Sequence, residues 1–149
     1  MGNRILSIAT FIIFLVPLVF SAGAEELVSN PRFQATITEE FPSAWTVWEP
    51  AWEKAACHVR KIAGGGITVS GSDPYSVGGV YQRIVGIEGE KAYAIKAVCE
   101  LRDVPMPYHS LAVRVSWMGG GKLLHPAGML VRGPIIENGV AKFDDVLVS

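Results

Sequence analysis

Two stretches in the second half of the chain, 92–101 and 111–118, alternate apolar and polar residues, as strands with one buried face do. The apolar face of the first stretch consists of Tyr93, Ile95, Ala97 and Cys99. The apolar face of the second consists of Leu111, Val113, Val115 and Trp117. We expect both faces in the core. An exterior sheet face suited to a polar, hydroxyl-rich ligand would then carry Lys96, Glu100, Arg114 and Ser116.

Beyond Glu25, short runs rich in Val, Ile, Tyr and Trp recur between clusters of Gly and Pro, and no long stretch has helical periodicity. The pattern predicts strands at 46–48, 57–62, 67–70, 80–87, 92–101, 111–118, 129–132 and 140–148. A series of short strands separated by turns predicts an all-β domain, specifically a jelly-roll β-sandwich.

The first 24 residues have the composition of a secretory signal peptide. Arg4 precedes an apolar run, and the small residues at 21–24 suit a signal peptidase. Pro17 interrupts the run, whereas a retained membrane anchor, the alternative, needs about 18 or more uninterrupted apolar residues. We therefore predict a signal peptide at 1–24 and a secreted or periplasmic domain at 25–149, with no membrane partner after cleavage.

The charge balance argues against a nucleic-acid partner. The 149-residue chain has 13 Lys and Arg and 14 Asp and Glu. Removing Arg4 with the leader leaves 12 − 14 = −2. Nucleic-acid-binding domains normally carry a basic patch, and Lys and Arg do not cluster in this way here.

The two cysteines, Cys57 and Cys99, both lie in the exported part. An oxidising compartment would permit a bridge between them. Free cysteines can equally pack as small apolar residues of neighbouring strands. Both alternatives are open, and two cysteines are too few for a four-ligand structural zinc site.

Six motifs, taken in order, resemble carbohydrate-binding modules of the jelly-roll type with a galactose-binding-like fold. They are Asn30-Pro31-Arg32-Phe33, Trp45, the run 79–84 (GVYQRI), the run 89–93 (GEKAY), the run 113–117 (VRVSW) and Phe143-Asp144-Asp145-Val146. The resemblance covers nearly all of the chain after the leader. It implies a non-catalytic module that binds a polysaccharide or oligosaccharide.

The resemblance also implies a structural calcium ion near the N-terminus, held by Asp144 and the region of Gln34. Calcium prefers six to eight oxygen ligands. Many family members have an acidic residue at the position of Gln34, so this site departs from the pattern. The interval 121–129 is shorter than in the family, which predicts a sandwich shortened near the C-terminus.

Aromatic side chains in loops are the first candidates for sugar contact, because their faces pack on the apolar faces of sugar rings while polar neighbours fix orientation. The predicted carbohydrate-binding residues are Trp48, Trp52, Tyr75, Tyr81, Gln82 and Arg114. In contrast, Trp45 and Trp117 fall at core positions. The mechanism requires the aromatic candidates to converge on one surface.

No catalytic constellation stands out. The three histidines are scattered, and the sequence contains no nucleophile elbow or zinc-binding helix motif. Two adjacent acidic pairs, 39–40 and 144–145, cannot act as a glycosidase couple, because neighbours on a strand face opposite ways. We therefore predict no enzymatic activity. Two alternatives remain: a structural or protein-interaction β-sandwich, and an accessory module of a glycoside hydrolase.

Overall fold

The computed structural model describes residues 25–51, 56–72, 76–124 and 129–149. The predicted leader, Trp52 and Tyr75 lie outside these residues. Within them the fold is built from strands, with one short helix, α1 (Pro107–Ser110). The all-β prediction is confirmed at this level. None of the helical structure in the described residues is long and apolar enough to span a membrane.

The strands form one three-stranded sheet and several two-stranded ribbons. The large sheet has the order β10 (Ile135–Glu137), β11 (Val140–Val148), β5 (Ala92–Glu100). The ribbons pair β1 (Thr46–Trp48) with β4 (Gly79–Tyr81), β2 (His58–Lys61) with β3 (Ile67–Ser70), β6 (Arg114–Val115) with β9 (Met129–Leu130), and β7 (Met118–Gly119) with β8 (Lys122–Leu123). All these pairings are antiparallel.

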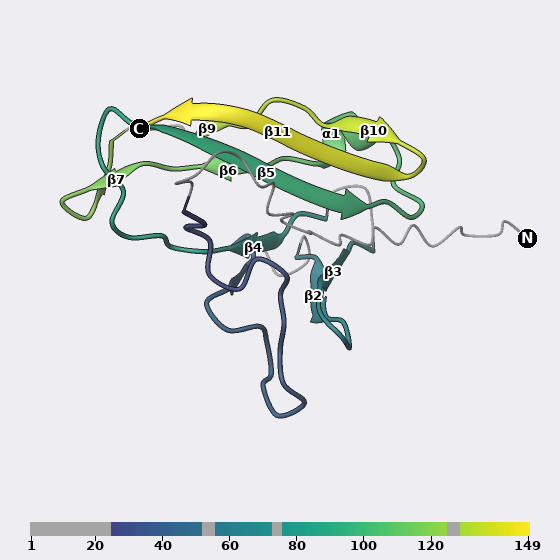
Figure 1. Cartoon of the computed structure of the whole chain (residues 1–149). Helices are drawn as coiled ribbons and strands as arrows, with labels where there is room; N and C mark the ends of the chain where they lie inside the picture. Colours follow the sequence, from purple (N-terminus) through teal and green to yellow (C-terminus); the bar gives the residue numbers. More distant parts are fainter. Residues whose placement is uncertain (1–24, 52–55, 73–75, 125–128) are drawn as a thin grey trace, which may run out of the picture.

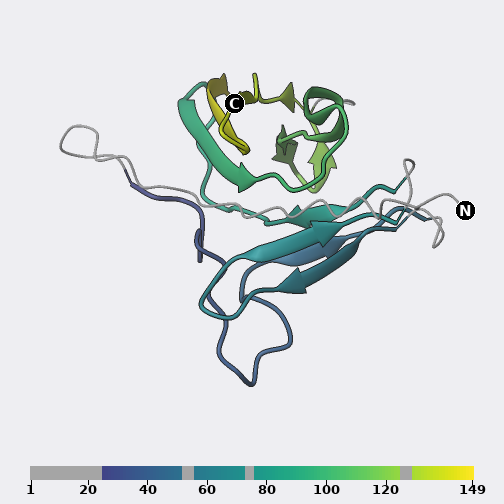
Figure 2. The same ribbon diagram turned by 90° about the vertical axis from the view of Figure 1, so that its right-hand side faces the viewer.

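Buried apolar side chains gather in two clusters. The larger cluster contains Ala97, Cys99, Leu111, Trp117, Val131, Ala141, Phe143 and Leu147. The smaller contains Phe33, Ile67 and Val69, with Phe41, Trp45, Cys57, Val59 and Val80 packed against them. Figure 2 shows the corresponding division of the chain: the part from β5 to β11 curls into an open ring, and the strands of the first half lie beneath it.

The N-terminal segment is fastened to the smaller cluster by the amide of Asn30. Its Nδ2 donates to the Gln34 carbonyl at 2.7 Å and its Oδ1 accepts from the Gln34 N–H at 2.8 Å. The Asn30 carbonyl accepts from the Trp45 indole N–H at 2.9 Å. This turn places Phe33, which is completely buried, against the Trp45 ring with centroids 4.3 Å apart.

The alternation in 92–101 and 111–118 correctly predicts which faces are buried. Tyr93, Ile95, Val113 and Val115 pack against the larger cluster, and Phe143 is buried in it. The strands at 46–48, 67–70 and 140–148 have the predicted bounds. Strand 111–118 is interrupted, because it pairs first with β9 and then with its own hairpin partner β8.

The predicted strand 80–87 ends at Tyr81. Val80 packs on the smaller cluster and Ile87 on the larger, so this run carries the chain from one cluster to the other and cannot stay in one ribbon. The Gln82 side chain bonds to the Ser29 backbone at the point where the strand stops.

Strand β10 was not predicted. It forms a hairpin with β11 through Asn138 and Gly139, which have positive φ angles of 50° and 74°. Two such residues between paired positions Glu137 and Val140 fit a tight two-residue hairpin turn.

The two cysteines are not bridged to each other. Cys99 is buried in the larger cluster and Cys57 packs on the smaller one. The structure therefore has the second of the two alternatives, in which each cysteine fills a small apolar position. Burial raises the pKa of the Cys99 thiol to about 11.

Candidate ligand-binding face on β1 and β4

The ribbon of β1 and β4 has one buried and one outward face. Val47 and Val80 are directly paired, and Val80 packs on the smaller cluster, which defines the inner face. Side chains alternate along a strand, so the pairs on either side of Val47–Val80 point outward. Those pairs are Thr46 with Tyr81 and Trp48 with Gly79.

Trp48 and Tyr81 are therefore diagonal neighbours on the outward face. Their exposed fractions are 48% and 51%, which are high for large aromatic side chains. Diagonal positions across an antiparallel pair lie about 7–8 Å apart, within reach of a single ligand. Two of the four predicted aromatic residues thus share one surface.

Gly79, directly opposite Trp48, leaves that surface open. A Cβ built at Gly79 meets no atom within 4 Å, and its φ lies outside the left-handed region. No cross-strand side chain therefore covers the Trp48 indole from this position. Sequence reasoning missed Gly79 because its importance depends on the pairing register, which a single strand does not reveal.

The smaller cluster supports the face from behind. Ile67 and Val69 of β3 are buried with Phe33 beneath the Val47–Val80 side of the ribbon. In Figure 1, β4 lies below the long β5 and β11 strands and beside β2 and β3. The outward aromatic side chains are thus carried on a packed element, although they lie outside the core.

Gln82 follows Tyr81, but its side chain is engaged by the backbone. Its Oε1 accepts from the Ser29 N–H at 2.8 Å and its Nε2 donates to the Ser29 carbonyl at 2.7 Å. This two-point contact joins the N-terminal segment to the end of β4. The structure thus gives Gln82 a positioning role next to the face.

Arg114 lies in the other half of the fold. It belongs to β6, whose inward side packs on the larger cluster, and its cross-strand partner is Leu130. Two further charges on the predicted exterior face are paired locally: Lys96 Nζ is 2.9 Å from Asp144 Oδ2, and Glu100 Oε1 is 2.8 Å from the Arg102 guanidinium. The structure does not group Arg114 with Trp48 and Tyr81.

Asp144 and Gln34, the calcium ligands expected from the resemblance, have different partners in the structure. The Asp144 carboxylate pairs with Lys96, whereas the backbone of Gln34 bonds with Asn30 beside the smaller cluster. Among the described residues, no three His, Cys, Asp or Glu side chains form a group able to hold a metal ion.

Asp145 has a different surrounding from Asp144. Its carboxylate accepts from the backbone N–H of Arg132 at 2.8 Å and of Val146 at 2.9 Å. These two hydrogen bonds, with the nearby Arg132 guanidinium, hold the pKa of the Asp145 carboxyl below its usual value. Asp145 thereby ties the segment after β9 to β11.

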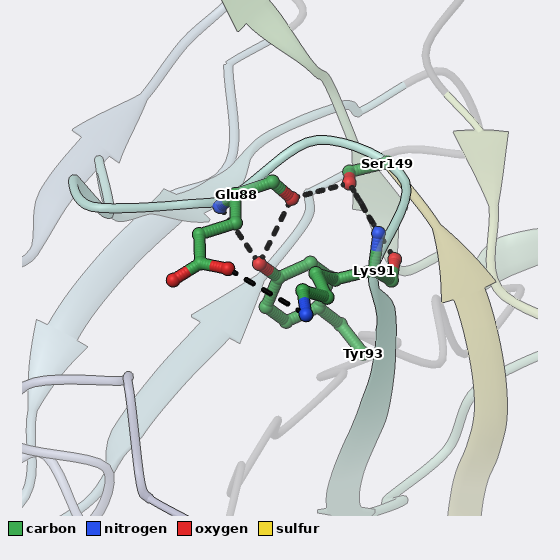
Figure 3. Close-up of polar contacts among 4 residues, drawn as sticks. All are labelled: Glu88, Lys91, Tyr93 and Ser149. Atoms are coloured by element: carbon green, nitrogen blue, oxygen red, sulfur yellow. Dashed lines mark hydrogen bonds and ion pairs between the residues drawn. The ribbon is translucent and has the colours of Figure 1, made fainter.

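A second polar group joins the ends of β5 and β11 (Figure 3). The Ser149 hydroxyl donates to the Glu88 carbonyl at 2.7 Å, and the Tyr93 hydroxyl donates to the same carbonyl at 3.1 Å. Lys91 Nζ lies 3.8 Å from the Glu88 carboxylate. The Ser149 hydroxyl thus faces a carbonyl where a nucleophilic serine would need a base. We therefore interpret these contacts as structural: they hold the start of β5 and the end of β11 together.

Comparisons with protein families, with curated proteins and with solved structures found no match. The resemblance to carbohydrate-binding modules therefore remains a prediction from the motifs.

Proposed function

We propose that this protein is an exported, non-catalytic carbohydrate-binding protein and that its ligand lies against the outward face of β1 and β4. The observation that carries the proposal is the shared exposure of Trp48 and Tyr81 on that face. Aromatic rings at such a spacing offer flat apolar surface to sugar rings, and their polar atoms remain available to hydroxyl groups.

The proposed ligand is a polysaccharide or an oligosaccharide, and the binding is weak. A shallow face leaves much of a flexible sugar chain in water, and ordering that chain opposes association. Val80, the cross-strand partner of Val47, packs on the smaller cluster and holds the ribbon there, so little protein reorganisation adds to this cost.

The proposed architecture is a shortened jelly-roll sandwich. The all-β composition, the antiparallel pairings and the order of the six motifs support it. Strand β8 lies at the start of the interval 121–129, which is short by comparison with the family, and forms a minimal hairpin with β7, in line with a trimmed edge.

A protein-interaction domain is the competing function, because exposed Trp and Tyr side chains are also frequent centres of protein interfaces. The two functions differ in what the same two side chains recognise.

The test is binding of the exported protein to a panel of soluble neutral polysaccharides, by affinity electrophoresis and calorimetry. Trp48→Ala and Tyr81→Ala should each weaken binding. Tyr108→Ala is the matched control, since Tyr108 is 62% exposed and belongs to α1, outside the β1–β4 ribbon. Equal binding by all three variants, or no binding to any polysaccharide by the unchanged protein, would overturn the proposal.

A further inference from the structure

A second outward surface follows β6 into β7. Arg114 is paired with Leu130, and Met118 is paired with Leu123, so each pair projects on one side of its ribbon. Residues 114, 116 and 118 are all exposed and alternate with the inward Val115 and Trp117. We call Arg114, Met118, Leu123 and Leu130 the outward strip.

The outward strip is apolar to an unusual degree for a surface. Met118, Leu123 and Leu130 are 50%, 51% and 61% exposed, and the neighbouring Leu124 is 60% exposed. Leu124 lies on the other side of the β7–β8 hairpin, where a Cβ built at Gly119 would touch it, so the hairpin exposes aliphatic side chains on both sides. Scattered apolar side chains are normal on protein surfaces, whereas large exposed apolar patches mark interaction sites. The group is aliphatic and contains no aromatic ring, unlike the face on β1 and β4.

The chain segment that carries the strip contains basic but no acidic residues. Between Asp103 and Glu137 the sequence contains no Asp or Glu, although acidic residues slightly outnumber basic ones in the whole chain. The same interval contains Arg114, Lys122 and Arg132. All three are exposed. Arg132 lies 4.0 Å from the Asp145 carboxylate, so the attraction to an anionic partner is assigned to Arg114 and Lys122.

The hairpin of β7 and β8 presents part of this strip at the edge of the molecule. Figure 1 shows the turn after β7 projecting beyond the neighbouring strands. Gly120 and Gly121 form the turn with positive φ angles of 56° and 78°. Met118 and Leu123 are therefore carried on a narrow projection. Lys122 pairs with Gly119 and faces the other side of this hairpin, at its exposed end.

We propose that the outward strip binds the surface of a membrane that contains anionic lipid headgroups. Exposed aliphatic side chains would enter the headgroup boundary, and Arg114 and Lys122 would interact with lipid phosphates. This inference is independent of the proposed carbohydrate site, which uses other residues, and it differs from the expectation of no membrane partner after cleavage of the leader.

The chemistry of the strip distinguishes this partner from the alternatives. An anionic polysaccharide would be bound by the cations but has no use for three exposed aliphatic side chains. A second copy of the chain could cover the aliphatic side chains, but it would bring the like charges of Arg114 and Lys122 together. Lipid surfaces accept both features at once.

The test is co-sedimentation with vesicles of phosphatidylcholine, with and without phosphatidylglycerol. The exported protein is recovered from a secreting host and its N-terminus is read first, so that any contribution of a retained leader is common to all variants. We expect binding that requires phosphatidylglycerol and weakens with added salt. The double variant Arg114→Glu, Lys122→Glu should lower binding by about tenfold or more.

The aliphatic part is tested with Met118→Ser, Leu123→Ser, which should also lower vesicle binding. Ile37→Ser is the matched control, because Ile37 is fully exposed on the N-terminal segment away from the strip. Unchanged melting temperatures establish that the variants are folded. The proposal is wrong if both double variants bind vesicles like the control, if only an anionic polysaccharide is bound, or if the strip variants only dissociate a dimer.

Discussion

Trp45 and Trp48 stand three residues apart and face opposite sides of the same segment. The Trp45 ring packs on Phe33 with an interplanar angle of 36° and donates its indole N–H to the Asn30 carbonyl. Trp48 is half exposed, and no side chain stands opposite it. One short segment therefore contributes both to the core and to the candidate ligand face.

Trp45→Ala should destabilise the fold by about 3 kcal/mol, because it removes a packed ring and leaves the Asn30 carbonyl without its partner. Trp48→Ala should leave the free energy of unfolding nearly unchanged. Urea unfolding of the two variants measures the difference. Comparable losses of stability would show that Trp48 belongs to the core.

Trp117→Ala should cost on the order of 3 to 5 kcal/mol, since Trp117 is buried in the larger cluster and its indole N–H points to the Met129 sulfur at 3.1 Å. Polysaccharide binding by the folded fraction should persist, because the ligand face lies on the other cluster. Urea unfolding measures the loss of stability, and titration calorimetry below the melting temperature of the variant measures the binding.

Gly79→Val should weaken carbohydrate binding without destabilising the fold. The new Cβ has room, φ is ordinary and a β-branched residue suits a strand, but the valine stands directly across from Trp48. Gly89→Val is the control, because a Cβ there also meets no atom. Equal binding by the two variants would mean that the Trp48 ring is not contacted from the Gly79 side.

Asp145→Asn should lower the melting temperature at neutral pH, since the ionised carboxylate is the form that the Arg132 and Val146 N–H groups stabilise. The folded pKa is lowered, so this stabilisation is present above the unfolded pKa, near 4, and is lost as the pH falls through the folded value. Between pH 6 and pH 3, the melting temperature should therefore decrease less steeply with falling pH for the variant than for the unchanged protein.

Asp144→Asn is the comparison for this measurement. Its carboxylate is mostly exposed and pairs with Lys96, and exposed ion pairs contribute little to stability. A change at Asp144 as large as that at Asp145 would contradict the role given to the Arg132 contact.

Thiol titration of the denatured, unreduced protein should give two thiols, because Cys57 and Cys99 are not bridged to each other. In the native protein at pH 8, Cys99 should react slowly, since burial raises its pKa to about 11. A titration that gives no thiol would show instead that the two cysteines form a disulfide.

Local sequence predicted the strands that repeat a regular alternation, and β11 has its predicted bounds. Local sequence failed to predict strand ends that are set by a contact with a residue far away in the sequence. Strand β4 stops at Tyr81 because the next residue bonds to Ser29, 53 positions away. Strand β10 had a local signal, the Asn138-Gly139 turn, but its three residues are too few to show alternation.

The candidate site was predictable in the same limited way. Trp48 and Tyr81 were both predicted as ligand-contacting aromatic residues, and both are exposed on one face. The separation of Arg114 from both required the pairing of β6 with β9. Which apolar cluster a strand covers depends on the topology, and a single sequence pattern does not encode it.

The division into two apolar clusters determines which measurements detect a bound ligand. Local opening of a protein follows its packed units, and a ligand raises the free energy of those openings that disrupt its site but not of local openings elsewhere. A sugar on Trp48 and Tyr81 should therefore slow amide hydrogen exchange in β1 to β4 and leave the local openings of β5 and β11 unaffected, so that residue-resolved protection identifies the bound face, which a melting temperature does not do.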